Sequence, residues 1–174
     1  MPTKHARDIM IPLDKYPHVP YWFTIRQAIA EMEMSTIEMK GKKSLPRAIL
    51  VFDETYQLMG VVRHHDIFKG LEPDFLRTMA VQHRKQMFNL EADPNLVDLS
   101  SGKIAGAIEE RANIPVSEIM QPIVSIVEYD DHLAKLIYLM ITRDINLLPV
   151  IRDNNIVGVV RSIDVFHELA HVVL

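Results

Sequence analysis

Apolar and polar positions follow the same order twice along the chain. Apolar residues at steps of three and four predict an amphipathic helix from about residue 25, through Ile25, Ala28, Ile29 and Met32. The same spacing predicts a second helix after residue 130, through Leu133, Leu136, Ile137, Met140 and Ile141. Thr24 and Gln27 have the spacing of a capping box, and Asp130 or Asp131 is the expected cap of the second helix.

Each of these helices precedes two apolar runs with a polar turn between them. The runs are AILVFDETYQLMGVV at 48–62 and LLPVIRDNNIVGVV at 147–160, and their lengths predict β-hairpins. Each hairpin leads into another helix, which begins HHDIF or SIDVF. The predicted unit is therefore short helix, strand, helix, strand, turn, strand, helix.

The two units are an internal repeat. GVVRHHDIF at 60–68 and GVVRSIDVF at 158–166 agree at six of nine positions, and RDIM at 7–10 corresponds to SEIM at 117–120. We expect a first repeat at 1–70, a helical linker or insertion at 71–115 with a helix starting near Pro73, and a second repeat at 116–174. The first repeat is longer, and we place its surplus around 33–47 as a longer helix and a basic loop.

Composition narrows the classes of function. The chain has 174 residues, 48% of them hydrophobic, which is enough for a core. Its net charge of −4 gives no basic footprint for nucleic acid, and the absence of cysteine excludes disulfides and thiolate chemistry. No apolar run is long enough for a membrane span or a signal peptide, so we expect a cytoplasmic protein without membrane or nucleic-acid partners.

The paired (D/E)IM and GVVRxxD(I/V)F segments resemble a tandem pair of cystathionine-β-synthase (CBS) domains. The resemblance implies an α/β (α+β) fold of two pseudo-symmetric repeats, each a small three-stranded sheet with helices, packed as one module. It also implies a homodimer that acts as a sensor and not as an enzyme, requires no cofactor, and controls an effector protein that the sequence does not identify. The implied regulatory ligand is AMP, ADP, ATP or S-adenosylmethionine, bound in the cleft between repeats.

The resemblance also places candidate ligand contacts in the repeated segment. Asp66 and Asp164 stand where family members hold ribose hydroxyls, and a carboxylate can accept two hydrogen bonds from a vicinal diol. The alternative is that each aspartate only caps a helix. Arg63 and Arg161 replace the usual Thr or Ser; each guanidinium suits a phosphate, or pairs with the aspartate three residues later.

Further candidates flank these positions. His64, His65 and Ser162 lie at the predicted helix starts, where they contact a ligand or only begin the helix. By resemblance, the walls of the cleft come from Pro149, Ile123 and Val124, which core packing explains equally well. The second repeat is closer to the family pattern, so we expect Asp164→Ala to weaken nucleotide binding more than Asp66→Ala.

Two alternatives remain beside the sensor. One keeps the fold but closes both clefts with side chains, which leaves a scaffold for dimerisation or partner binding. The other, more remote, is a zinc hydrolase, because HELAH at 167–171 matches the HExxH pattern. A catalytic zinc needs a third protein ligand, and the motif falls in the closing helix of the second repeat, so we predict no metal and no catalytic residue.

Overall fold

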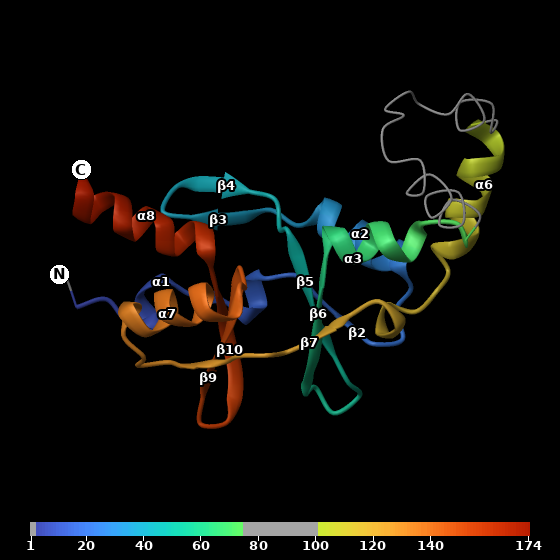
Figure 1. Cartoon of the computed structure of the whole chain (residues 1–174). Coiled ribbons are helices and arrows are strands. Elements are labelled where there is room, and N and C mark those ends of the chain that lie inside the picture. The colour runs from blue at the N-terminus through green and yellow to red at the C-terminus, as the bar shows by residue number, and fades with distance from the viewer. Residues whose placement is uncertain (1–2, 75–100) are drawn as a thin grey trace.

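In the described part of the chain, two four-stranded sheets lie side by side, each with helices packed on it, and a two-stranded hairpin stands beside them (Figure 1). The structure, a computed structural model, describes residues 3–74 and 101–174. The mixed α/β architecture and the two pseudo-symmetric halves agree with the prediction from the sequence.

The first sheet has the strand order β2-β5-β6-β7. Strand β2 (His18–Pro20) runs parallel to β5 (Ala48–Phe52), which forms the predicted hairpin with β6 (Leu58–Arg63). All five residues of β5 are buried: Ile49 and Val51 pack with helices α2 (Ile25–Met34) and α3 (His64–Leu71), and Leu50 and Phe52 pack with Ile11 and Val159 on the other face. The capping box is confirmed, because the Gln27 amide N–H donates to Thr24 Oγ1 at 3.2 Å and the Thr24 amide N–H to Gln27 Oε1 at 2.9 Å.

The second sheet has the order β1-β10-β9-β8 and repeats this plan. Strand β8 (Val127–Glu128) runs parallel to β9 (Leu147–Arg152), and β9 pairs with β10 (Asn155–Arg161). Helices α7 (Leu133–Arg143) and α8 (Ser162–Val173) pack with this sheet. The cap expected at Asp130 or Asp131 is wrong, because His132 Nδ1 accepts the Ala134 amide N–H at 3.1 Å while Asp131 accepts the Glu128 amide N–H.

The halves exchange their first strands. Strand β1 (Ile11–Pro12), from the start of the chain, pairs with β10, and β7 (Gln121–Pro122) pairs with β6. The helical turns before them follow: α1 (Ala6–Ile9) packs into the second core and η2 (Val116–Glu118) into the first. Each half therefore completes the other, and each sheet has four strands instead of the predicted three because it receives one strand from the other half.

The surplus of the first repeat is a hairpin, and the longer helix expected there is wrong. Helix α2 ends at Met34, and β3 (Ile37–Met39) pairs with β4 (Lys42–Ser44) around Lys40 and Gly41. Both turn residues have positive φ, 51° and 80°, a conformation that Gly41 accepts without strain. A 3₁₀ turn, η1 (Leu13–Lys15), lies earlier in the same half.

The described part of the segment between the repeats contains a helix. Helix α6 (Ser101–Arg111) precedes the second repeat, and Arg111 Nε donates to the Gly70 carbonyl at 2.7 Å. The helix predicted to start near Pro73 falls outside the described residues. Within residues 3–74 and 101–174, no helix is long and apolar enough to cross a membrane.

Candidate functional site

The repeated arginine and aspartate bind each other in both halves. Arg63 Nε and Nη2 donate to the two oxygens of Asp66 at 3.0 and 3.1 Å, and Arg161 Nε and Nη2 to those of Asp164 at 2.7 and 2.8 Å. These are two-point ion pairs across the start of α3 and α8, the alternative that the sequence had left open. Both aspartates are buried, at 2% and 6% exposed, so these are not the weak surface pairs that i,i+3 spacing alone would suggest.

Asp66 has no accepting capacity left. Besides the two bonds from the Arg63 side chain, it accepts the Arg63 amide N–H at 2.9 Å and Gln121 Nε2 at 3.1 Å. Four hydrogen bonds fill the four acceptor positions of a carboxylate. Burial alone would raise the pKa of Asp66, but the bonds from Arg63 outweigh it and hold the pKa below its ordinary value.

Asp164 differs because its neighbour on the exchanged strand is apolar. Gln121 of β7 lies opposite Val61, and the corresponding partner of Val159 is Ile11 of β1, which carries no donor. Among the described residues, Asp164 therefore accepts only the two bonds from Arg161, which leaves two acceptor positions of the carboxylate. The two halves share the same pair of residues but leave only one of the carboxylates available.

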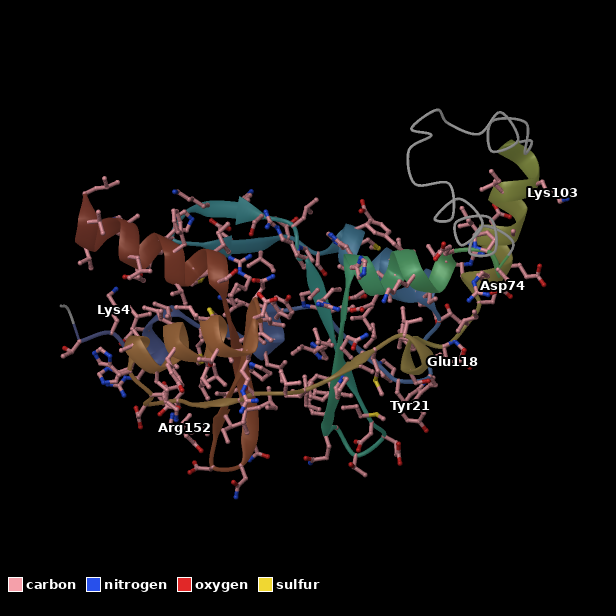
Figure 2. All side chains as sticks on the ribbon, in the orientation of Figure 1. Lys4, Tyr21, Asp74, Lys103, Glu118 and Arg152 are labelled. Carbon is pink, nitrogen blue, oxygen red and sulfur yellow. The ribbon has the colours of Figure 1, made fainter. Side chains whose placement is uncertain are left out.

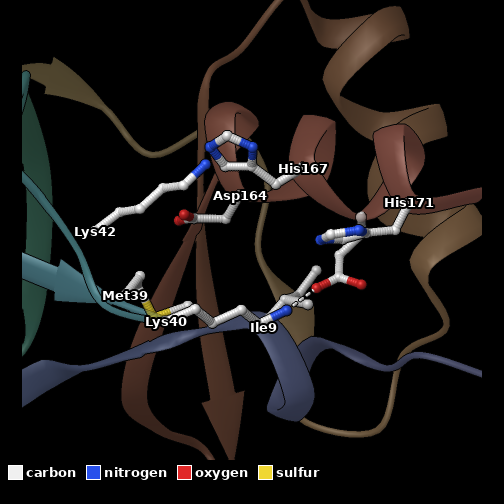
Figure 3. Close-up of a pocket in the computed structure, with 8 residues that line it drawn as sticks. Ile9, Met39, Lys40, Lys42, Asp164, His167 and His171 are labelled. Carbon is white, nitrogen blue, oxygen red and sulfur yellow. Dashed lines mark hydrogen bonds and ion pairs between the residues drawn. The ribbon is translucent and has the colours of Figure 1, made fainter. Parts of the chain in front are cut away.

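Asp164 also lines a pocket, which Asp66 does not reach. The pocket, about 260 Å³, lies between α8, α1 and the β3–β4 hairpin, and we call it the Asp164 pocket (Figure 3). Its lining residues are Ile9, Met39, Lys40, Lys42, Asp164, His167, Glu168 and His171.

Most of the other residues predicted to contact a ligand lie outside the Asp164 pocket. Ser162 is the first residue of α8, and its amide N–H donates to the Asn146 carbonyl at 2.8 Å. His64 and His65 are exposed on the first turn of α3, and Pro149 is buried in β9 opposite Val159. None of these four lines the Asp164 pocket.

Ile123 and Val124 follow β7, away from Asp164. Ile123 lines a separate cavity of about 280 Å³ at the tips of the two long hairpins, together with Tyr56 and Asn154, and Val124 is exposed. Their role as walls of a ligand site stays a prediction, as does phosphate binding by Arg63 and Arg161.

The β3–β4 hairpin contributes to the pocket, which the sequence pattern did not predict. Met39, Lys40 and Lys42 come from the first repeat but line a pocket in the second. Ser44 Oγ accepts Arg161 Nη1 at 2.9 Å, which joins the end of the hairpin to the aspartate pair. The available signal was the basic, Gly-containing stretch at 39–43, which was recognised as an extra loop but not as part of a site.

Glu168 holds together three segments beside the pocket. This carboxylate is 5% exposed and forms ion pairs with Lys40 of the hairpin and, at 3.2 Å, with Lys4, labelled in Figure 2 near the start of the chain. Burial opposes ionisation, but the two ammonium groups outweigh it and lower the pKa of Glu168.

These ion pairs bear on the zinc alternative. In HExxH enzymes the glutamate between the histidines is the general base, whereas Glu168 is bound by two lysines. Within the described ranges, 3–74 and 101–174, no group of three His, Cys, Asp or Glu side chains could hold a metal ion. The geometry therefore does not favour a zinc hydrolase.

Tyr16 is buried near the Arg161–Asp164 ion pair. Its hydroxyl donates to the Ala48 carbonyl at 2.8 Å, and burial raises the pKa of the phenol far above its ordinary value. Tyr16 therefore stays neutral and donates its hydroxyl hydrogen to β5 of the first sheet, while its ring packs in the cluster that contains Val159 of β10.

Comparison with known proteins gives the class of this fold. Residues 116–171 match the family model of the CBS domain, and no curated protein matches the chain. Solved structures match nearly all of it at low identity. A CBS domain of a membrane protein from Sphaerobacter thermophilus is 17% identical, with a TM-score of 0.64 over 95% of this chain and 87% of that one.

Two further structures match at a similar level. A CBS domain-containing protein of unknown function from Bacillus anthracis is 18% identical, with a TM-score of 0.64 over 97% of this chain and 94% of that one. CBSX2, solved in complex with AMP, is 15% identical, with a TM-score of 0.61 over 97% of both chains. The fold is that of CBS domains. The family match is confined to residues 116–171 in the second repeat, and the first repeat shares the fold of the matched structures.

Proposed function

We propose that this chain is a regulatory module that binds an adenosine-containing ligand in the Asp164 pocket. The observation that carries the proposal is the state of Asp164, which is fixed by Arg161, lines a pocket and keeps two acceptor positions. A ribose presents two adjacent hydroxyl donors, which match those positions. The fold shared with CBSX2, which was solved with AMP, supports the same ligand class.

Binding, without chemistry, is the proposed activity. The module would act by stabilising one conformation on ligand binding, and the protein that responds would be a separate effector. Phosphate is the expected partner of the cations around the pocket. No step of catalysis follows from the lining residues, because Glu168 and Asp164 are both held in ion pairs.

One observation in the first half favours the alternative in which side chains close the cleft and the chain acts as a scaffold. Asp66 is enclosed by Arg63 and Gln121, as expected for a cleft closed by side chains. The two halves would therefore divide the roles, with the second half binding ligand and the first half structural.

Homodimer formation belongs to the same proposal. Phe68 on α3 and Phe166 on α8 occupy equivalent positions of the two repeats, and they are 67% and 66% exposed; Tyr138 and Ile141 on α7 are exposed as well. Aromatic side chains of this kind are enriched at interfaces. Light scattering of the purified protein should give twice the 20.0 kDa mass of the chain, and a monomer at all concentrations would contradict this part of the proposal.

Thermal unfolding with a ligand panel tests the proposed binding. Ligand that binds only the native state stabilises it, by about 2.7 kcal/mol at a hundred times Kd. We expect AMP, ADP or ATP to raise the melting temperature of the wild type and of the Asp66→Ala variant, each compared with the same protein without ligand. Asp164→Ala should lose this response. Absence of any shift with adenosine compounds at millimolar concentration would reject the sensor and leave the scaffold.

A further inference from the structure

The β3–β4 hairpin belongs to the first repeat in sequence but lies along α8 of the second (Figure 1). It is attached at its turn and at the end of β4. Lys40 forms the ion pair with Glu168, and Ser44 accepts the hydrogen bond from Arg161. Ile37 is buried with Tyr16 and Val159, which anchors the base of the hairpin to the second sheet. The hairpin is therefore a fixed wall of the Asp164 pocket.

Positive charges outnumber negative charges around the Asp164 pocket. The two carboxylates of the pocket, Asp164 and Glu168, are accompanied by four cations, which are Lys4, Lys40, Lys42 and Arg161. Arg161 neutralises Asp164, while Lys4 and Lys40 share Glu168. Lys42 has no carboxylate partner among the residues that the structure describes, so the pocket carries an excess of positive charge.

The Lys42 side chain points in a direction from which its ammonium group could contact a bound anion. Figure 3 shows its amine end pointing toward the His167 ring, on the same side of the pocket as the Asp164 carboxylate. A ligand whose diol rests on Asp164 would therefore have its phosphate within the region that Lys42 and His167 line. Both side chains can donate hydrogen bonds to phosphate oxygens.

We propose that Lys42 of the hairpin is a phosphate-binding residue and selects adenosine phosphates over the uncharged nucleoside and over S-adenosylmethionine. The proposal rests on the proposed function, because it concerns the same pocket. S-adenosylmethionine carries a sulfonium cation in place of the phosphate, and the excess positive charge disfavours it. The volume of about 260 Å³ is below the usual range for ligand sites, roughly 300–1,000 Å³, so it suits a mononucleotide better than a dinucleotide.

The next residue on the same strand offers a matched control. Lys43 carries the same charge and is exposed, but it does not line the pocket, since successive side chains of a strand point to opposite faces. Lys42→Ala and Lys43→Ala therefore remove the same charge from the same hairpin, and only the first removes it from the pocket.

Isothermal titration calorimetry of the wild type, Lys42→Ala and Lys43→Ala tests this inference, with ATP, adenosine, S-adenosylmethionine and inorganic tripolyphosphate as probes. Lys42→Ala should weaken ATP binding about tenfold, as expected for loss of one charge-assisted hydrogen bond. It should leave adenosine binding unchanged and abolish tripolyphosphate binding. Lys43→Ala should behave as the wild type, and S-adenosylmethionine should bind the wild type more weakly than ATP does.

Three results would overturn the selection by Lys42. They are equal weakening of ATP and adenosine by Lys42→Ala, equal loss in the two variants, and a wild type that does not bind tripolyphosphate. Failure of the proposed function gives a different result. The wild type would then bind tripolyphosphate in a Lys42-dependent way, would not bind adenosine, and would bind ATP no more tightly than tripolyphosphate. Binding of adenosine without tripolyphosphate would leave the proposed function in place and reject the inference.

Discussion

At the scale of single residues, identical signatures have acquired different environments. GVVRxxD predicts equivalent aspartates, and the ion pair with arginine is indeed formed in both halves. The difference comes from outside the signature, because Gln121 completes the shell of Asp66 while Ile11 leaves that of Asp164 open. The expected ranking of Asp164 above Asp66 stays a prediction, and the structure gives it a physical reason that the sequence did not.

The ionised carboxylate of Asp66 makes a testable contribution to the free energy of unfolding. Because its folded-state pKa lies below the unfolded value of about 3.9, the ionised form stabilises the fold above that pH, and this stabilisation is lost as the pH falls through the folded-state pKa. Asp66→Asn should lower the free energy of unfolding at pH 7 by about 1–3 kcal/mol, since Arg63 loses its partner. Urea unfolding at a series of pH values measures the difference, which should shrink toward pH 3.

Asp14→Asn is the control for this effect. Asp14 is exposed, and no hydrogen bond or ion pair is recorded for it among the described residues, so its substitution should change stability little at any pH. A deficit of Asp66→Asn that is constant from pH 7 to pH 3 would contradict the role assigned to the ionised carboxylate.

At the scale of elements, the exchanged strands explain the glycine that opens each signature. A Cβ at Gly158 would lie 2.4 Å from the Ile11 carbonyl oxygen of β1, and one at Gly60 would lie 2.6 Å from the Gln121 carbonyl oxygen of β7. Both contacts are with backbone, which cannot move aside without breaking the strand pairing. The glycines therefore permit the close approach of the exchanged strand.

Gly158→Ala and Gly60→Ala should each lower the free energy of unfolding by about 1–3 kcal/mol, as overpacking in a close-packed region does. Gly106→Ala is the matched control, because a Cβ there meets nothing within 4 Å, and α6 should gain roughly 0.5–1 kcal/mol from the replacement. Chemical denaturation of the three variants measures these changes. Unaltered stability of Gly158→Ala would show that β1 does not pack against β10 as described.

Local patterns predicted the elements that depend on neighbouring residues. The capping box at Thr24, the two long hairpins and the helices after them were all confirmed. The β3–β4 hairpin was missed because its strands are short and depend on packing against the other half, through Ile37. The strand exchange also depends on contacts distant in sequence, which periodicity does not report.

At the scale of the whole molecule, neither half is complete without the other. Ala6 and Ile9 belong to the core of the second half, and Val116 belongs to that of the first. The hairpin of the first half walls the pocket of the second, and Lys4 and Lys40 meet on Glu168. The sequence can be divided into two repeats, but each hydrophobic core contains residues from both of them.

A fragment of residues 113–174 should therefore fail to fold alone. It lacks α1 and β1, so its core would be open at Ile9 and the edge of β10 unpaired. Circular dichroism during heating should show no cooperative transition for this fragment, in contrast to the full chain. A cooperative transition near the melting temperature of the full chain would mean that the exchange contributes little.

The central claim is that one half binds an adenosine compound and the other half is closed. Calorimetric titration of the full chain with ATP tests it most directly, because it counts sites. We predict one site per chain, unchanged in Asp66→Ala and lost in Asp164→Ala. Two sites per chain, or a single site that Asp66→Ala removes and Asp164→Ala retains, would contradict the assignment.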